Sequence, residues 1–372
     1  MSTTGRDQAP AAAASDAAAA LDAAAFVRLV SDATGAALAA TGVLARALDD
    51  AGTPFQASVA APFADPDRTT EADATVALGR PHPAADYALC DRPAAAAFET
   101  VRELGASPDA TLALAGTVAA GDVDGSVAEA AEQAGLERRP GVAVPVADLA
   151  DGLAHSTLLS APFSGTEAQV RAALSDLDLP SELDDDARRR VASLVALAVT
   201  GTDTAPPRAA AAVERALRPY AGGPFETVGG YADVLDAVAR ERPGVGIALA
   251  LGHESVRDEA LDAWRTHGGR AHAAVASATT GRYDGLFVAR GDAMPVGTAA
   301  RLVADFRAPE PVTLVVTDGE AAARAADGRD VAAPMRTAAE SVDGTAVGRG
   351  ERARARFDVS TADFITAFRE AV

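Results

Sequence analysis

The sequence predicts an α/β protein with two α/β domains, the first with a mostly parallel sheet and the second with a mixed sheet, joined by a helical middle section. Short apolar runs alternate with Ala-rich stretches of helical length over residues 21–119, and again from about residue 223. This alternation is typical of a sheet that helices cover on both faces. Between about 126 and 220 the chain has helical pieces and loops instead, and Pro206-Pro207 marks a break.

The first domain opens with a strand, a tight turn and a helix between Phe26 and Leu48. The strand reads FVRLV and is apolar except for Arg28, and the turn Ser31–Gly35 leads into an Ala/Leu-rich helix. Such a turn lies at the carboxyl end of a strand and the amino end of a helix, where ligands and metals usually bind. Further strands are predicted at 55–60, 74–79 and 86–90, a helix at about 94–104, and another apolar segment at 111–121.

The same patterns predict the remaining elements. Helices are predicted at 126–134, 167–174, 185–198, 231–240, 255–268, 298–306, 335–341 and 361–371. Strands are predicted at 245–252, 271–277, 284–291, 311–318 and 352–359. The predicted boundaries are a disordered tail at 1–20, which lacks an apolar period, a first α/β domain at 21–160, a helical connector at 161–222 and a second α/β domain at 223–372.

Composition limits the class of protein. All 33 basic residues are arginine, Asp and Glu number 53, and the net charge is −20, which a halophilic source explains better than a cationic partner does. The global charge therefore does not exclude nucleic-acid binding, and local arginine clusters become informative. The single Cys90 excludes an internal disulfide and a cysteine-based metal cluster. No apolar run reaches the roughly 18 residues of a membrane span, and the chain opens without a signal-peptide pattern, so we expect a cytoplasmic protein without a membrane partner.

Six stretches, taken in order, resemble the archaeal RecJ-like branch of the DHH phosphoesterases. They are FVRLVSDATGAALAATGVLARAL (26–48), DATVALG (73–79), LALAGTVAAGD (112–122), GLAHSTLLSAPFSGT (152–166), PFETVGGYADVLDAVARERPGVGIALALG (224–252) and AAESVDGTAVGRGERARARF (338–357). The resemblance covers most of residues 25–372 and implies an N-terminal DHH domain followed by a DHH-associated C-terminal domain.

The catalytic motifs of that family are degenerate in this chain. Active members hold two divalent ions, normally manganese, between Asp and His side chains, and two neighbouring ions need bridging carboxylates. At the family's motif positions the chain has Val30 for the first His, Asp32 for the first Asp, Thr34 for the second Asp, Ala77 for the Asp of the second motif, and Arg349 for the His of the C-terminal turn. The motif that names the family reads Cys90-Asp91-Arg92-Pro93.

Only Asp32, Asp91 and Asp122 remain as candidate metal ligands. Such a set could hold one Mg²⁺ weakly through waters, but not a two-metal centre. The alternative for Asp32 is a carboxylate in the first turn of a helix, where it complements the helix dipole. We therefore expect no cofactor, or Mn²⁺ or Mg²⁺ if some activity remains. The five histidines lack metal-pair spacing, and we expect them at the surface or at helix caps; they are His82, His155, His253, His267 and His272.

The most suggestive local feature is the arginine-rich segment from Arg349 to Arg356. In a strand, Arg352, Arg354 and Arg356 point to one face and the two intervening alanines to the other. Three guanidiniums on one face suit a run of phosphates, and in the resembled family the corresponding turn helps to hold the nucleic-acid backbone. The alternative is an edge strand whose charges prevent sheet-to-sheet aggregation. Arg188–Arg190 is more simply a helix face paired with the aspartates before it.

Three functions stay open. The first is a RecJ-like protein without catalysis that binds single-stranded nucleic acid or assembles replication or repair complexes. The resemblance implies single-stranded DNA, the GINS complex or an active RecJ-like paralogue as partners, and a catalytically dead relative fills such a scaffold role in the eukaryotic replicative helicase. The second is a metal-dependent 5′→3′ single-strand exonuclease or phosphodiesterase using Asp32, Asp91 and Asp122. The third is a protein-binding module without nucleic-acid contact.

Overall fold

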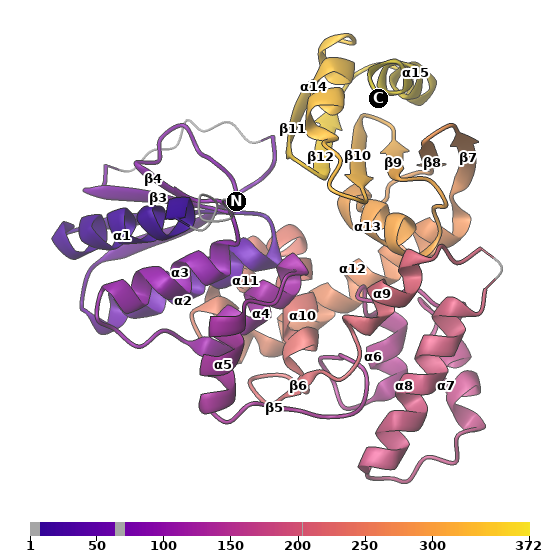
Figure 1. Cartoon of the computed structure of the whole chain (residues 1–372), viewed down its shortest axis with the longest axis horizontal. Helices are drawn as coiled ribbons and strands as arrows, with labels where there is room; N and C mark the ends of the chain where they lie inside the picture. The colour runs from indigo at the N-terminus through magenta and orange to yellow at the C-terminus, as the bar shows by residue number, and fades with distance from the viewer. Residues whose placement is uncertain (1–7, 64–70, 203) are drawn as a thin grey trace, which may run out of the picture. The chain divides into compact units, whose positions relative to one another are not determined.

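The chain folds into two compact units in the computed structural model, which describes residues 8–63, 71–202 and 204–372 (Figure 1). Unit 1 comprises the chain up to Arg139, Ala143–Ala147 and Pro219–Trp264. Unit 2 comprises Pro140–Val142, Asp148–Arg218 and Arg265–Val372. These units differ from the predicted boundaries, because residues 219–264 belong to unit 1 and residues 148–218 belong to unit 2. None of the described helices is both long enough and apolar enough to cross a membrane.

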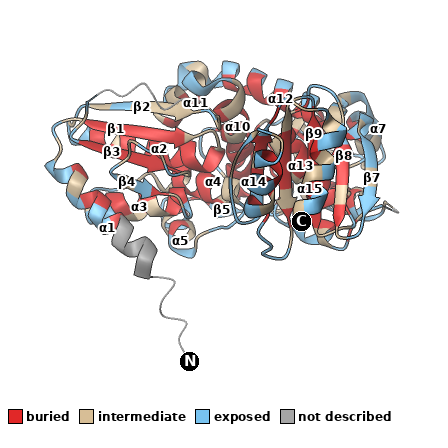
Figure 2. Ribbon diagram, turned by 90° about the horizontal axis from the view of Figure 1, so that it is seen from above, coloured by how far each residue is buried: buried red, intermediate tan, exposed pale blue. Residues whose placement is uncertain are grey.

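Unit 1 is built on a four-stranded sheet whose strands are all parallel, in the order β2-β1-β3-β4. The strands are β1 (Val27–Asp32), β2 (Phe55–Ala60), β3 (Ala74–Leu78) and β4 (Tyr87–Leu89). The central strands β1 and β3 are buried along almost their whole length, as the red ribbons of Figure 2 show. The predicted parallel first sheet is confirmed, and Asp32 lies at its carboxyl edge.

The helices of unit 1 pack on this sheet or on one another. They are α1 (Gln8–Ala23), α2 (Gly35–Asp50), α3 (Pro93–Glu103), α4 (Ala110–Ala120), α5 (Gly125–Gln133), α10 (Val228–Glu241) and α11 (Pro243–Ala250), with the short pair β5 (Glu137–Arg138) and β6 (Tyr220–Ala221) and the 3₁₀ turn η1 (Glu254–Val256). The Ala-rich helix α2 is central, since it packs against α3, α4 and α10 and is buried on nearly all sides. Small side chains permit this close packing, which explains the alanine content of the segment.

Two predictions for unit 1 are wrong. Residues 245–252, predicted as a strand, form most of α11, which packs on α2 and β2. A short continuous apolar run fits a buried helix as well as a strand, and Pro243 at the first helical position favours the helix. The predicted disorder over 1–20 is wrong for residues 8–20, which belong to α1, where Ala17 and Leu21 are buried. Residues 1–7 lie outside the described part of the chain.

Unit 2 contains a six-stranded mixed sheet in the order β11-β12-β10-β9-β8-β7. Only β8 and β9 pair in parallel; the other neighbours are antiparallel, so the predicted mixed second sheet is confirmed. The strands are β7 (Thr279–Tyr283), β8 (Leu286–Arg290), β9 (Val312–Thr317), β10 (Glu320–Ala325), β11 (Thr345–Arg349) and β12 (Arg352–Arg356). The helices are α6 (Leu149–His155), α7 (Glu167–Ser175), α8 (Asp185–Thr200), α9 (Arg208–Glu214), α13 (Val296–Phe306), α14 (Ala332–Glu340) and α15 (Thr361–Ala371).

The two faces of this sheet differ. On one face, Ala321 and Ala323 of β10 and Ala353 and Ala355 of β12 form a core with residues of α14 and α15. Because side chains alternate along a strand, Arg324 of β10 points to the opposite face, where it pairs with Asp305 of α13. Helix α13 packs on β9 and β10 of that second face.

Helix α12 (Arg257–Ser277) overturns two further predictions. It is continuous from 257 to 277, so the predicted strand at 271–277 is its last turns. His267 and His272 are 1% and 4% exposed and hence not surface histidines. His267 Nε2 lies 2.8 Å from Thr298 Oγ1, and His272 Nε2 lies 2.8 Å from the carbonyl oxygen of Ser156. The Gly268-Gly269 pair lies within the helix and does not break it. A Cβ at Gly268 would lie 1.9 Å from the carbonyl oxygen of His155, so glycine at this position permits the close approach of α6.

Candidate functional site

The turn between β1 and α2 is held by a second helix of unit 1. Thr34 caps α2, its Oγ1 accepting a hydrogen bond from the Ala37 amide at 3.3 Å. The carboxylate of Asp236 in α10 accepts a second one from the Gly35 amide at 2.9 Å. A Cβ at Gly35 would lie 2.8 Å from the Asp236 backbone nitrogen, so the close approach of α10 requires glycine there. The amino end of α2, where a ligand was expected, is therefore capped by Thr34 and Asp236.

Guanidiniums neutralise the carboxylates at this turn. Asp32 does not cap the helix; its Oδ1 lies 3.6 Å from Nε of Arg80. Asp236 forms an ion pair with Arg240, one turn later in α10. Burial lowers the pKa of the Arg240 guanidinium, but Asp236 and, more weakly, Asp32 outweigh burial and hold this pKa above its usual value. Two aspartates and two arginines thus balance one another at the edge of the sheet.

The other two predicted metal remnants lie at the start of α3 and after α4. Asp91 follows β4, and Arg92 precedes α3 with a left-handed backbone (φ 50°). Nε of Arg92 lies 3.1 Å from Oδ2 of Asp122, and its terminal nitrogen lies 2.6 Å from Oδ2 of Asp124. The Asp122 side chain is 66% exposed. Arg92 therefore stands as a cation beside the carboxylate that the family resemblance offered as a ligand.

These residues do not fit a two-metal centre. Among the described residues, three metal-ligating side chains with atoms within 4.8 Å of one another occur at Asp151, His155 and Glu167, and not at Asp32, Asp91 and Asp122. Two ions need several bridging carboxylates, whereas Asp32 and Asp122 face guanidiniums. At this edge of unit 1, Asp32 and Asp122 are thus each paired with an arginine.

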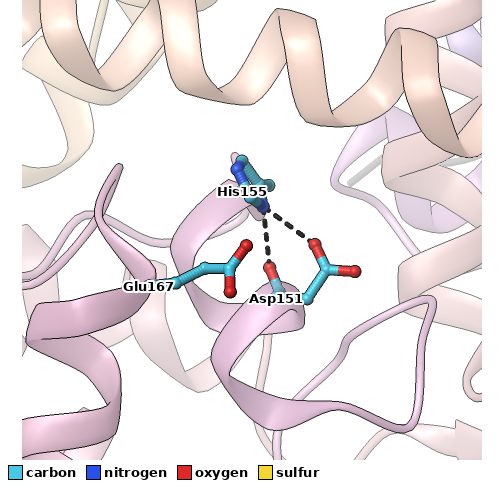
Figure 3. A group of neighbouring side chains, drawn as sticks. All are labelled: Asp151, His155 and Glu167. Carbon is cyan, nitrogen blue, oxygen red and sulfur yellow. Dashed lines mark hydrogen bonds and ion pairs between the residues drawn. The ribbon is translucent and has the colours of Figure 1, made fainter.

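The group Asp151, His155 and Glu167 lies in unit 2 and could hold a metal ion (Figure 3). Nδ1 of His155 lies 2.9 Å from Oδ1 of Asp151, one turn earlier in α6, and 3.0 Å from its carbonyl oxygen. Glu167 opens α7 and faces them. Sequence reasoning missed the group because it considered pairs of histidines, and the available signal was an Asp and a His four residues apart on one helix.

Arginines already engage both carboxylates of this group. Arg265 of α12 approaches Asp151 with its terminal nitrogen at 2.9 Å and its Nε at 3.1 Å. Burial raises the pKa of Asp151, but hydrogen bonds and charge from Arg265 outweigh it, so the pKa of this carboxyl lies below its usual value. Glu167 pairs with Arg171 at 2.6 Å. The Asp151–Arg265 ion pair therefore ties α6 to α12, whereas the Glu167–Arg171 pair lies within α7.

The predicted strand of alternating arginine and alanine is confirmed, but its alternative as an edge strand is wrong. Strand β12 lies inside the sheet, between β11 and β10. Ala353 and Ala355 are buried in the core, whereas Arg352 and Arg356 are exposed and Arg354 is half-buried. Charged side chains on an internal strand do not protect a sheet edge, so they need another explanation.

Arginines also face one another across the strands. Arg352 lies directly opposite Arg324 of β10 and directly opposite Arg349 of β11, so three guanidinium-bearing residues form one row. Like charges directly opposite one another are unfavourable in a sheet. Burial, followed by the charge of Arg352, lowers the pKa of Arg324 to about 10, although Asp305 at 3.9 Å opposes this shift. The row therefore concentrates positive charge that a bound anion would relieve.

Together these residues define the arginine face, which consists of Arg324, Arg349, Arg352, Arg354 and Arg356. The ion pairs on this face include that of Asp305 with Arg324 and those of Glu320 with Arg354 and Arg356. Five guanidiniums thus gather on one face of one sheet in a chain of net charge −20. This local concentration of positive charge is the strongest chemical signal of the described residues of unit 2.

Comparisons with known proteins give the family of this chain. A family model described as the C-terminal domain of the uncharacterized protein rrnAC1427 matches residues 278–370. The protein of that name from Haloarcula marismortui is 72% identical over 376 residues and is covered completely, as is this chain.

Solved structures show the fold. RecJ from Thermus thermophilus in complex with Mn²⁺ matches 96% of this chain and 54% of its own, with a TM-score of 0.51 and 16% identity. CDC45 from Entamoeba histolytica matches 98% of this chain and 97% of its own, with a TM-score of 0.56 and 8% identity. The chain spans about half the length of that RecJ. It has a RecJ-like fold, and by its sequence it belongs to the family of the rrnAC1427 protein.

Proposed function

We propose that this protein is a RecJ-like member of the DHH family that binds single-stranded nucleic acid and does not hydrolyse it. The observation that carries the proposal is the arginine face, five guanidiniums gathered on one face of a sheet in an acidic chain. A linear series of separate guanidiniums on one strand suits a polyanion, since each can meet a different phosphate. Binding without catalysis is supported by the ion pairs of Asp32 with Arg80 and of Asp122 with Arg92.

The first experiment measures affinity for a labelled oligonucleotide by fluorescence anisotropy over a range of salt concentrations. The triple variant Arg352→Gln, Arg354→Gln and Arg356→Gln should weaken binding by at least about tenfold. It should also flatten the salt dependence by up to about 2 in log–log slope, since each lost phosphate contact to a single strand removes about 0.7. A duplex of the same sequence distinguishes single-strand from double-strand binding.

The matched control is the triple variant Arg188→Gln, Arg189→Gln and Arg190→Gln on α8 of the same unit. It removes the same charge from arginines outside the sheet, among them Arg189, which is paired with Asp186, and Arg190, which is bonded to the carbonyl of Leu177. Equal losses of affinity in both triple variants would show that the effect comes from the overall charge of the protein and not from the arginine face. Absence of binding in the wild-type protein, or binding that the β12 variant leaves unchanged, would overturn the proposal.

The metal-dependent exonuclease is the alternative function. Its specific support is a group able to hold a metal ion, Asp151, His155 and Glu167, together with the Mn²⁺ complex of the RecJ that shares this fold. Incubation of labelled single-stranded DNA with Mn²⁺ should give no shortened products. Hydrolysis that disappears in Asp32→Ala would show that the active site lies at the edge of the unit 1 sheet. Hydrolysis that disappears only in Asp151→Ala would show that the active site lies in unit 2.

The assembly function has its own test. CDC45 shares this fold. We propose that the protein also binds a replication or repair protein, either the GINS complex or an active RecJ-like paralogue. A pull-down with the full chain, performed with and without nuclease treatment, separates the two modes. A partner retained after nuclease treatment and retained by the β12 triple variant would favour a protein-binding module over nucleic-acid binding.

A further inference from the structure

We propose that Glu320 competes with a bound polyanion for two arginines of the arginine face. Its carboxylate pairs with Arg354 and Arg356 until the polyanion displaces it. The inference rests on the proposed function and adds a regulator to that surface. Glu320 is the first residue of β10 and lies directly opposite Arg356 in the register. Its Oε1 lies 3.4 Å from Arg356, and its Oε2 lies 3.8 Å from Arg354. One carboxylate thus bridges two of the three arginines on β12.

The geometry of these ion pairs makes the carboxylate displaceable. Charge-assisted N–H···O bonds usually measure about 2.7–2.9 Å, so contacts of 3.4 and 3.8 Å are loose. The Glu320 side chain is 37% exposed, and solvent screens such a pair. A phosphate has more oxygens and a fixed charge, and a nucleic acid brings several phosphates at once, so it can replace one carboxylate on both guanidiniums.

Asp305, another carboxylate on the face, is held differently from Glu320. Asp305 is 9% exposed and is held at 2.9 Å by Arg215, outside the face, while it approaches Arg324 at 3.9 Å. This carboxylate is fixed in the fold by its bond to Arg215 and is not displaceable without loss of that bond. The two acids therefore have different roles: Asp305 offsets the charge of the inner arginine, and Glu320 covers the outer two.

The arrangement has a chemical consequence for selectivity. The row of Arg324, Arg352 and Arg349 has arginine, not a carboxylate, directly opposite Arg352 on both sides. A ligand that reaches only this row gains nothing from displacing Glu320, whereas a ligand that also reaches Arg354 and Arg356 must compete with it. Glu320 thus weakens the binding of every anion that extends along β12 to Arg354 and Arg356, whereas a single small anion bound at the row does not have to displace it.

The test is the affinity of Glu320→Gln for a labelled single-stranded oligonucleotide, measured against Glu370→Gln. Both variants remove one negative charge from unit 2, but Glu370 is an exposed residue of α15, a helix that covers the opposite face of the sheet. We expect Glu320→Gln to bind about three- to tenfold more tightly at low salt, with a steeper salt dependence, and Glu370→Gln to change affinity less than about twofold. Inorganic phosphate should bind both variants alike.

A second background makes the test specific. In a protein that carries Arg354→Gln and Arg356→Gln, the Glu320→Gln change should have no effect, because the side chains with which it pairs are gone. Equal affinities of the Glu320→Gln and Glu370→Gln proteins, or an effect of Glu320→Gln that persists in that background, would overturn the inference. If instead neither the wild-type protein nor Glu320→Gln binds the oligonucleotide, the proposed function itself has failed.

Discussion

The β1–α2 turn and the arginine face arrange the same kinds of side chain in opposite ways. At the turn, Asp32 and Asp236 meet Arg80 and Arg240, and their charges cancel within unit 1. On the arginine face, five guanidiniums gather on one face of a sheet, and three of them share one row across the strands. The turn therefore holds ion pairs that are internal to unit 1, whereas positive charge is concentrated on the sheet of unit 2.

The largest effect is expected where charges are internally paired. Asp236→Ala should destabilise the protein by about 3 kcal/mol, because it leaves the largely buried Arg240 without its carboxylate and removes a cap from α2. Chemical denaturation measures the change. The double variant with Arg240→Ala should recover part of the loss, and a loss that does not recover would show that the ion pair is not its source.

Substitutions on the arginine face, unlike Asp236→Ala, should not destabilise the protein. The β12 triple Gln variant should have a free energy of unfolding within about 1 kcal/mol of the wild-type value, or higher. It removes Arg352, which lies opposite Arg324 and Arg349, at the loss of the loose pairs of Glu320 with Arg354 and Arg356. The same denaturation experiment measures this. A loss as large as that of Asp236→Ala would make these arginines structural and would remove the contrast between the two regions.

The Asp151 network should behave like the turn, with a defined pH dependence. The pKa of Asp151 lies below the usual value of 3.8. The Asp151 carboxylate therefore stabilises the fold above pH 3.8, and this contribution is lost as the pH falls below that value. Asp151→Asn should cost about 1.5 kcal/mol at neutral pH, the order of a hydrogen bond to a charged group. The difference from the wild type should shrink on acidification; a difference that is constant with pH would contradict the ion pair with Arg265.

The smallest effect concerns His82, next to the turn. Burial, then Arg28 and then Arg80, lowers the pKa of this histidine below 6.5. Arg80→Gln should therefore raise the pKa of His82, which NMR titration of the ring protons measures, and should leave oligonucleotide affinity unchanged. An unchanged His82 pKa would show that Arg80 does not act on it, and a change in affinity would extend the binding surface to unit 1.

Most local elements could be predicted from the sequence because their evidence is local. The period of two in residues 352–356 indicated which arginines share a face, and Ala353 and Ala355 are indeed buried. The order of strands and helices from β1 to α3 followed from short apolar runs and Ala-rich segments. The continuous run at 245–252 was ambiguous, since it has no period that separates a buried strand from a buried helix.

What only the tertiary structure decided is which residues meet across long stretches of chain. Asp236 reaches the Gly35 amide over 201 positions, and neither residue carries a local sign of this bond. The Ala-rich strand β10 has weak strand propensity, so the sequence left both the neighbour of β12 and the position of Glu320 unknown. Side-chain period is a property of a few consecutive residues, whereas charge balance depends on pairing between distant strands and helices. The sequence by itself therefore determined the arginine stripe, and the tertiary structure determined which arginines and carboxylates lie against it.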